Sequence, residues 1–447
     1  MREIAVAIGL LLCSEAGYAD ALSLSLLDAY QRGLTQDPRL AAADAQFRSE
    51  KEAYPSALAG LLPMVGALGA YAYTDQTTEY KNFSTPLAGT RSYQWYRYGA
   101  TVTQPVYRKD RIEGFGQAKL LEAQAGLRLE AASQDYILRV TQAYIDVLLA
   151  LDNLELSRIE KSANEGQRLR AKRAFEVGTA TVTDVSDAQA RFDLTAAREI
   201  AAVNNVEVAK ENLTRVIGLG AYTLSMLATD IPLTPPNPAD VDHWIKKALT
   251  ANLQLRIANH GLDIAAYEVE RTKGLAYPSL DLVATYGVNS QVNSALNHPL
   301  DTTQTDVQLQ LSVPLYSGGL ASSRLRAIQA DKDRAARMLE DTRRQVIALA
   351  QQAYLNVANG MEQVRALQQA VLSSQGSLDA TQRGLEVGLR TALDVLNAQQ
   401  QLFTAKRDLA NARYQYLMGQ LRLKYAVGEL SERDLQALDK WFVKRGG

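Results

Sequence analysis

The sequence predicts a mixed α+β membrane protein built from two copies of one structural unit, each with a β-hairpin and very long helices. Three observations support this fold class: an internal repeat, four segments of alternating hydrophobicity, and two long stretches of helical periodicity. Because each copy carries both strand-like and helix-like sequence, the repeat sets the architecture of the chain.

The two copies lie 210 positions apart (175 against 385). At this shift residues 175–185 align with residues 385–395. The triplet Gln142-Ala143-Tyr144 matches Gln352-Ala353-Tyr354 at the same shift. A period this long excludes a solenoid of short repeats and indicates a duplicated half-protein.

Residues 1–19 have the pattern of a secretory signal peptide. An early positive charge is followed by an apolar run at residues 4–12 and by the small-residue cleavage site Gly17-Tyr18-Ala19. The run is too short to span a bilayer. Cys13, the only cysteine, lies inside this segment, so cleavage leaves no thiol and no disulfide. A lipid-modified Cys13 is the alternative, but Leu12 is not the small residue that lipoprotein signals have there.

Composition and motifs argue against nucleic-acid binding and catalysis. Lys and Arg number 48 against 49 Asp and Glu, so no basic face is indicated. The histidines His243, His260 and His298 lack the spacing of metal ligands, and no nucleophile elbow or phosphate-binding loop occurs. Acidic pairs such as Asp184 with Asp187 are expected on a solvated helix face. We therefore expect no catalytic residue, no metal and no cofactor.

Four segments have the period of two that predicts strands: residues 64–74, 93–103, 280–288 and 307–313. Their length of about ten residues suits the tilted strands of an outer-membrane barrel. No long apolar stretch follows the signal, so a helical membrane protein is excluded. The alternative is the edge of a soluble β-sandwich, but nine aromatic residues crowd the first hairpin, as in an interfacial girdle. They are Tyr71, Tyr73, Tyr80, Phe83, Tyr93, Trp95, Tyr96, Tyr98 and Tyr107.

Residues 109–176 and 322–386 contain no proline and have apolar residues at spacings of three and four. About 65 residues at 1.5 Å each make a helix of roughly 100 Å. A compact globule does not contain a helix of that length, so these stretches predict coiled-coil elements.

Both long helices are expected to end at a glycine. Gly178 and Gly388 are expected to form left-handed caps. Thr183 and Thr391 are expected to cap the return helices, each with an aspartate in the first turn, where the helix dipole favours negative charge.

The predicted order is helix, β-hairpin, long helix, tight turn and return helix, twice. The expected parts are the signal peptide, a first repeat at residues 20–231, a proline-rich linker at 232–243, a second repeat at 244–430 and a C-terminal helical tail at 431–447. The expected hairpins are residues 63–106 and 279–314, the long helices 109–177 and 322–387, and the return helices 184–217 and 394–427.

Four strands are too few to close a membrane barrel. An open sheet in lipid leaves unpaired backbone groups that cost several kcal/mol each. Two copies give eight strands, whose own side chains fill the interior, and three copies give twelve. A homotrimer is therefore the smallest assembly with an open bore, and we expect its helices to form a second tube beneath the barrel.

An ordered set of motifs occurs in both halves. Tyr54-Pro55-Ser56 and Tyr277-Pro278-Ser279 precede the hairpins, residues 104–107 and 313–319 follow them, and residues 387–399 are the most specific stretch. In these motifs the chain resembles the TolC family of outer-membrane export channels over essentially its mature length.

The resemblance implies a TolC-like homotrimer. Its 12-stranded β-barrel would lie in the cell outer membrane, in contact with lipid, and continue as a periplasmic α-helical barrel of coiled coils. The implied partners are a periplasmic adaptor (membrane fusion) protein and an inner-membrane ABC or RND transporter, in type I secretion or tripartite efflux. The adaptor would dock at the helix-tip turns, which are Val177, Gly178, Thr179, Val387, Gly388 and Leu389.

The resemblance also implies a periplasmic gate. Carried over by position, Arg390 would bond Thr183 and Asp184, and Asp394 would form a three-fold acidic ring in the bore. The alternative is that Arg390 and Asp184 are only solvent-facing charges at a turn and that Asp394 is an ordinary carboxylate at the start of a helix.

The chain departs from the family pattern at two gate positions. Leu385 replaces an aromatic residue of the closing network, and Asn397 replaces a second acidic ring. Together the two changes predict looser closure and milder cation selectivity. The sequence does not indicate the cargo, although the missing lipidation cysteine favours type I secretion. A periplasmic coiled-coil or adaptor protein without a pore is the alternative function, but adaptors lack paired aromatic hairpins.

Overall fold

The computed structural model describes residues 23–79, 81, 89–218, 222–228, 230–291 and 299–443. The predicted signal peptide with Cys13 lies outside the described residues, as do Tyr80, Phe83 and His298. The chain divides into two compact units, which do not coincide with the two sequence repeats. One unit comprises Met1–Ala41, Ala132–Ala248 and Ala348–Gly447, and the other comprises Ala42–Ala131 and Leu249–Ile347.

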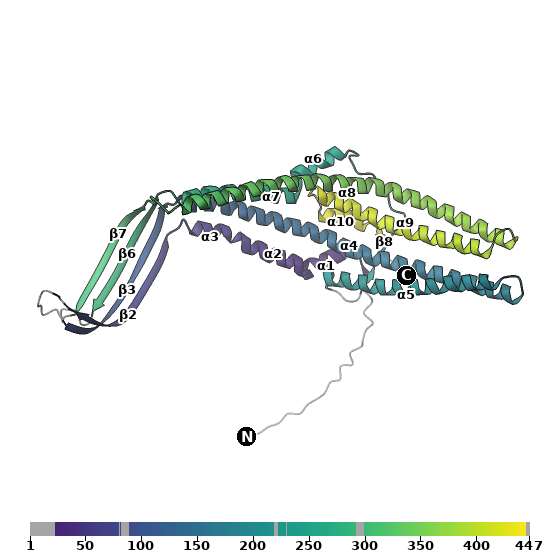
Figure 1. Cartoon of the computed structure of the whole chain (residues 1–447), viewed down its shortest axis with the longest axis horizontal. Coiled ribbons are helices and arrows are strands. Elements are labelled where there is room, and N and C mark those ends of the chain that lie inside the picture. Colours follow the sequence, from purple (N-terminus) through teal and green to yellow (C-terminus); the bar gives the residue numbers. More distant parts are fainter. Residues whose placement is uncertain are drawn as a thin grey trace, which may run out of the picture. The chain divides into compact units, whose positions relative to one another are not determined.

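The second of these units contains a four-stranded antiparallel sheet and the helices that lead into it and out of it. Its strands lie side by side in the order β2-β3-β6-β7 (Figure 1). The elements are α2 (Pro38–Lys51), α3 (Ala53–Ala59), β2 (Met64–Thr78), β3 (Gly89–Tyr107), α7 (Leu253–Gly274), β6 (Ser279–Gln291), β7 (Leu300–Ser312) and the first parts of α4 (Lys109–Glu176) and α8 (Leu320–Glu386).

The register of the sheet separates an apolar face from a polar one. Paired residues on neighbouring antiparallel strands share a face, and successive residues alternate between faces. One row across the sheet consists of Val65, Val102, Ala284 and Val307, and the next row, on the other face, consists of Gly66, Thr101, Thr285 and Asp306. The apolar face remains solvent-exposed in the single chain, where Val65 is 74% and Val307 is 71% exposed.

The sheet has two open edges. The two hairpins pair through β3 and β6, so β2 and β7 each have one neighbour among the described residues. Each of these edge strands therefore presents a row of unpaired backbone groups along 15 residues in β2 and 13 in β7.

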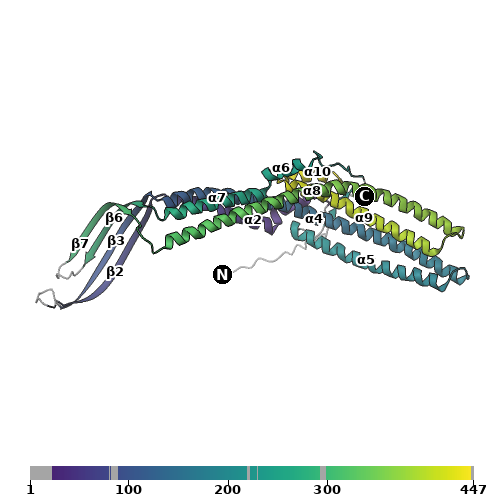
Figure 2. The same ribbon diagram turned by 45° about the horizontal axis from the view of Figure 1, so that its top comes forward.

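The first unit consists of two antiparallel helix pairs and a set of short elements packed on them. Figures 1 and 2 show α5 running beside the end of α4, and α9 beside the end of α8. The elements are β1 (Ser23–Leu24), α1 (Leu26–Gln36), α5 (Val182–Ile217), β4 (Thr223–Leu224), β5 (Met226–Leu227), α6 (Val241–Ala251), α9 (Ala392–Ala426), α10 (Glu432–Asp439), β8 (Phe442–Val443) and the last parts of α4 and α8.

Each helix pair has its own apolar interior. In the first pair, Leu154 of α4 packs with Ala202 and Val206 of α5. In the second pair, Leu378 of α8 packs with Val395 and Leu402 of α9. We call α4 with α5 the first coil and α8 with α9 the second coil. The helices α4 and α8 contain 68 and 67 residues.

A fully buried tyrosine ties the short elements to the first coil. Tyr144 of α4 is 0% exposed, and its hydroxyl lies 3.1 Å from the carbonyl oxygen of Leu24 and 3.0 Å from that of Ser225. These carbonyls belong to the β1–β4 region, where the two strands pair in parallel. Burial raises the pKa of Tyr144 above its ordinary value, so the hydroxyl stays protonated and can donate to these acceptors.

The C-terminal segment differs from its prediction. Residues 431–447 were expected to be helical, but α10 ends at Asp439 and the chain then forms β8. Strand β8 pairs with β5, placing Phe442 opposite Leu227. The ring of Phe442 packs edge-on against Tyr144 at 5.4 Å between centroids. This long-range pairing is the reason that the helix does not continue.

None of the helices in the described part of the chain is long and apolar enough to cross a membrane.

The Tyr144 contacts lead to a stability prediction. We expect Tyr144→Phe to lower the apparent melting temperature in detergent, because the buried carbonyl oxygen of Ser225 loses the hydroxyl donor and that of Leu24 keeps only the amide of Ser225, at a cost of about 1–3 kcal/mol. Tyr354→Phe is the matched control, since Tyr354 is the repeat equivalent and makes no side-chain hydrogen bond among the described residues. Equal melting temperatures for the two variants would contradict the assigned role of Tyr144.

Candidate functional site

The two helix-tip turns have the same backbone geometry. Gly178 and Gly388 have φ values of +79° and +78°, in the left-handed region that favours glycine. The next amide reaches back five residues: Thr179 N lies 2.8 Å from Ala174 O, and Leu389 N lies 2.8 Å from Gly384 O. This is the hydrogen bond of a Schellman motif, so both glycines end their helices as predicted.

The caps of the return helices agree with the prediction in one repeat and correct it in the other. Thr391 is the N-cap of α9, as expected, and forms a capping box with Asp394. The N-cap of α5 is Thr181, not Thr183, and it forms the same box with Asp184. The helix consequently begins at Val182, two residues before the predicted start. The prediction of Thr183 was wrong because only a residue three positions before the aspartate can close this box.

The capping boxes keep both aspartates ionised. The backbone N–H and then the hydroxyl of Thr181 donate to Asp184, which lowers the pKa of this carboxyl. Thr391 lowers the pKa of Asp394 in the same way, and the charge of Arg390 lowers it further. Each turn therefore presents a fixed negative charge at a helix start.

The turns also expose apolar side chains. Val177 is 73% exposed, Val387 is 69% exposed and Leu389 is 82% exposed. Together with Gly178, Thr179 and Gly388, these residues form two equivalent protruding tips. Apolar side chains presented at a tip are available to a partner protein.

The predicted gate residues lie in two groups in the described chain. Thr183 and Asp184 are at the start of α5, and Arg390 and Asp394 are at the start of α9. Arg390 lies near Asp394, on the same turn, and its backbone amide bonds Gly384 O at 3.1 Å. Within the described part of one chain, its side chain makes no hydrogen bond to Thr183 or Asp184. The link between these groups stays a prediction, and it concerns contacts that one chain alone does not make.

Leu385 and Asn397, the two departures from the family pattern, each contact identifiable partners in the structure. Leu385 packs against the apolar interior of the second coil. Asn397 accepts a hydrogen bond from Arg191 of α5, with 2.7 Å between Asn397 Oδ1 and the guanidinium nitrogen. The same guanidinium donates to Gln400 at 2.7 Å. Asn397 therefore takes part in a contact between the two coils.

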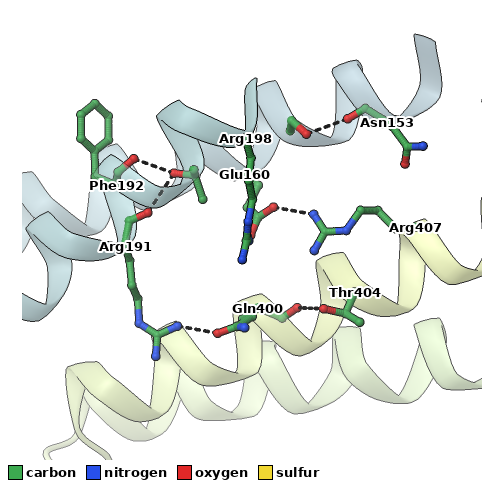
Figure 3. A network of polar contacts seen from close by, with 10 residues as sticks. Asn153, Glu160, Arg191, Phe192, Arg198, Gln400, Thr404 and Arg407 are labelled. Carbon is green, nitrogen blue, oxygen red and sulfur yellow. Dashed lines mark hydrogen bonds and ion pairs between the residues drawn. The ribbon is translucent and has the colours of Figure 1, made fainter. Parts of the chain in front are cut away.

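A polar network above the tips was not predicted from the sequence. Figure 3 shows Arg407 reaching from α9 to Glu160 of α4, and Arg191 reaching from α5 to Gln400 of α9. The Glu160 carboxylate also accepts from Arg198 of α5 at 3.2 Å. The signal was present in the sequence as a polar continuation of the apolar stripe of α4, because Ser157, Glu160 and Asn164 follow Leu154 at helical spacing and are all buried.

No group of three or more histidine, cysteine, aspartate or glutamate side chains that could hold a metal ion occurs among the described residues. The candidate site therefore consists of two charged, apolar-tipped turns and a network of charged and amide side chains between two coils. This arrangement can bind a protein surface and can hold two helix pairs together.

The profile of the outer membrane efflux protein family matches residues 29–219 and 244–429, one match in each half of the chain. The outer membrane protein TolC of Vibrio cholerae serotype O1 is 32% identical over 413 residues, covering 92% of each chain. The alkaline protease secretion protein AprF of Pseudomonas aeruginosa is 32% identical and covers 95% of this chain and 88% of its own.

The solved structures show the same fold. The Campylobacter jejuni CmeC outer membrane channel superposes with a TM-score of 0.78 at 15% identity and covers 99% of this chain and 98% of its own. The family is one of transport channels and not of enzymes. The chain thus belongs to the outer membrane efflux protein family and is an outer-membrane export channel of the TolC type, with its helical part in the periplasm.

Proposed function

We propose that three copies of this chain form one channel in which their sheets close a 12-stranded barrel. The observation that carries this proposal is the four-stranded sheet with one apolar face and two open edges. In hydrocarbon each unpaired edge group costs several kcal/mol, so an open sheet is not stable there. Pairing β2 of one chain with β7 of the next removes every edge, and a twelve-stranded ring is wide enough for a bore.

The unpartnered face of α5 supports the same assembly. Leu194, Ile200 and Val208 are 60%, 73% and 53% exposed in the single chain. Apolar residues at this density on one helix indicate a surface that is covered in the complete protein. In the proposed trimer, a neighbouring coil covers it, and the coils of three chains form the periplasmic tunnel.

The helix-tip turns are the proposed periplasmic end of this tunnel. In the closed state Arg390 bonds Thr183 and Asp184 of the first-repeat coil, and three copies of Asp394 line the bore. A single exposed ion pair is weak, but three symmetry-related copies act together on one tip. Such a gate favours the closed state and still allows a docking partner to shift it.

The proposed partners are a periplasmic adaptor protein and an inner-membrane ABC or RND transporter. The exposed apolar tips at residues 177–179 and 387–389 are the proposed docking surface. Type I secretion is the favoured route, because AprF and the Dickeya chrysanthemi protein PrtF, which are similar over almost the whole chain, are named as protease secretion proteins. Tripartite efflux is the second candidate, supported by the description of the family.

The orientation of the sheet in the membrane can be tested by charge substitution. We expect Val307→Arg to reduce the amount of heat-stable trimer in the outer membrane, since a charge on the lipid face costs up to about 2–4 kcal/mol per chain, depending on depth. Gln308→Arg is the matched control, because the neighbouring residue points to the opposite face. Trimer yields on unheated gels measure both, and a greater loss with Gln308→Arg would reverse the proposed orientation.

The gate is tested by conductance. We expect Arg390→Ser to raise the conductance of the purified channel in a planar bilayer, because the second coil loses its contact with Thr183 and Asp184. Arg383→Ser removes the same charge from the same coil and serves as the control, since within the described residues the Arg383 side chain bonds only its own helix, at Asp379 O. Unchanged conductance of Arg390→Ser would refute the gate assignment, and a wild-type protein that forms no channel would refute the function.

A further inference from the structure

Glu160 is a buried carboxylate shared between the two coils of one chain. Its side chain is 4% exposed, and its two oxygens bond different arginines. One oxygen accepts from Arg198, which belongs to the same coil, at 3.2 Å. The other accepts from Arg407 of α9, in the other coil, at 2.7 Å.

The contact of Glu160 with Arg407 is one of a series of polar contacts between α4 and α9. The hydroxyl of Tyr414 donates to Asp152 at 2.8 Å, and burial raises the pKa of both groups. Because the two helices are antiparallel, the residue numbers of successive partners increase along α4 and decrease along α9. These contacts are Gln142–Arg422, Asp152–Tyr414 and Glu160–Arg407. Nearer the tips they are followed by the contacts of Arg191 of α5 with Asn397 and Gln400 of α9. We call this set the seam.

The seam differs physically from the apolar clusters inside each coil. The apolar clusters around Leu154 and Leu378 join helices of the same coil. Apolar contact is non-directional, whereas a charge-assisted hydrogen bond requires a defined distance and angle. A displacement of the second coil against the first therefore keeps both apolar clusters and breaks the seam.

We propose that Glu160 is a positioning residue for the gate, holding the second coil in its closed position through Arg407. This inference rests on the proposed function, since it takes opening to be a displacement of the second coil. On opening, Glu160 keeps Arg198, which moves with it, and loses Arg407. A buried carboxylate that loses one of its two guanidinium partners opposes that movement.

The test measures open and closed populations of the purified full-length trimer in planar bilayers. Arg407→Gln and Glu160→Gln are each expected to raise the ratio of open to closed channels about tenfold. Arg198→Gln is expected to change the ratio much less, because its bond exists in both states. The double variant Glu160→Gln with Arg407→Gln is expected to match the larger single effect, because both changes remove one shared contact.

Glu199→Gln is the matched control. Glu199 is a neighbouring glutamate of the first coil, bonded to Lys161 at 2.9 Å and to Arg158 at 3.5 Å, both within that coil. It is expected to leave the ratio unchanged. The proposal is overturned if Glu160→Gln and Arg407→Gln form heat-stable trimers with a wild-type ratio, or if Glu199→Gln or Arg198→Gln has the same effect as Arg407→Gln.

The outcomes separate this inference from the proposed function. A rise with Arg390→Ser and none with Glu160→Gln and Arg407→Gln leaves the channel and its gate in place and removes the role of Glu160. Where Glu160→Gln fails to assemble, Arg407→Gln decides the question, because Arg407 is the more exposed partner, at 26% against 4%.

Discussion

Backbone hydrogen bonding at the edges of one small sheet is the constraint on which the proposed assembly depends. In water, the open edges of β2 and β7 would be hydrated, but hydrocarbon offers them no partner. The register places an apolar row containing Val65 and Val307 on one face of this sheet, so the sheet is suited to lipid only when its edges are closed. If other copies of the chain pair with these edges, their coils come together as well. The exposed apolar face of α5 would then be covered by a neighbouring coil. In the proposed assembly, barrel and tunnel would thus follow from one requirement.

The apolar clusters lie inside the coils, whereas the contacts of the seam between the coils are polar. Inside a coil, residues such as Leu402 and Val206 keep two helices together in any arrangement of the remainder. Between coils, the contacts at Glu160, Asp152 and Arg191 are hydrogen bonds and ion pairs with one preferred geometry. The proposed gate requires units that persist and boundaries that rearrange, and the apolar clusters and the seam would supply them.

Much of the fold could be predicted from the sequence because it is local or repeated. Gly178 and Gly388 were found from their place after a long periodic stretch, and the 210-residue shift aligns Thr181 with Thr391, so the repeat contained the correct cap that the local choice of Thr183 missed. The pairing of Phe442 with Leu227 and the bond between Glu160 and Arg407 join residues more than 200 positions apart. No local pattern encodes such a partner, although the polar interruption of the α4 stripe marks where one is needed.

The two departures at the tip bear on where the proposed gate would be held closed. The family pattern would place an aromatic residue at position 385 and an acidic ring at position 397, both serving the tip. Here Leu385 instead joins the interior of the second coil, and Asn397 bonds Arg191 across the seam. Exposed ion pairs at the tip are weak in water, whereas breaking a buried charge pair costs about 3–5 kcal/mol. If the gate is as proposed, the buried Glu160 contact would carry a larger share of closure than the reduced tip network, and the greatest resistance to opening would lie along the coils and not at the turns.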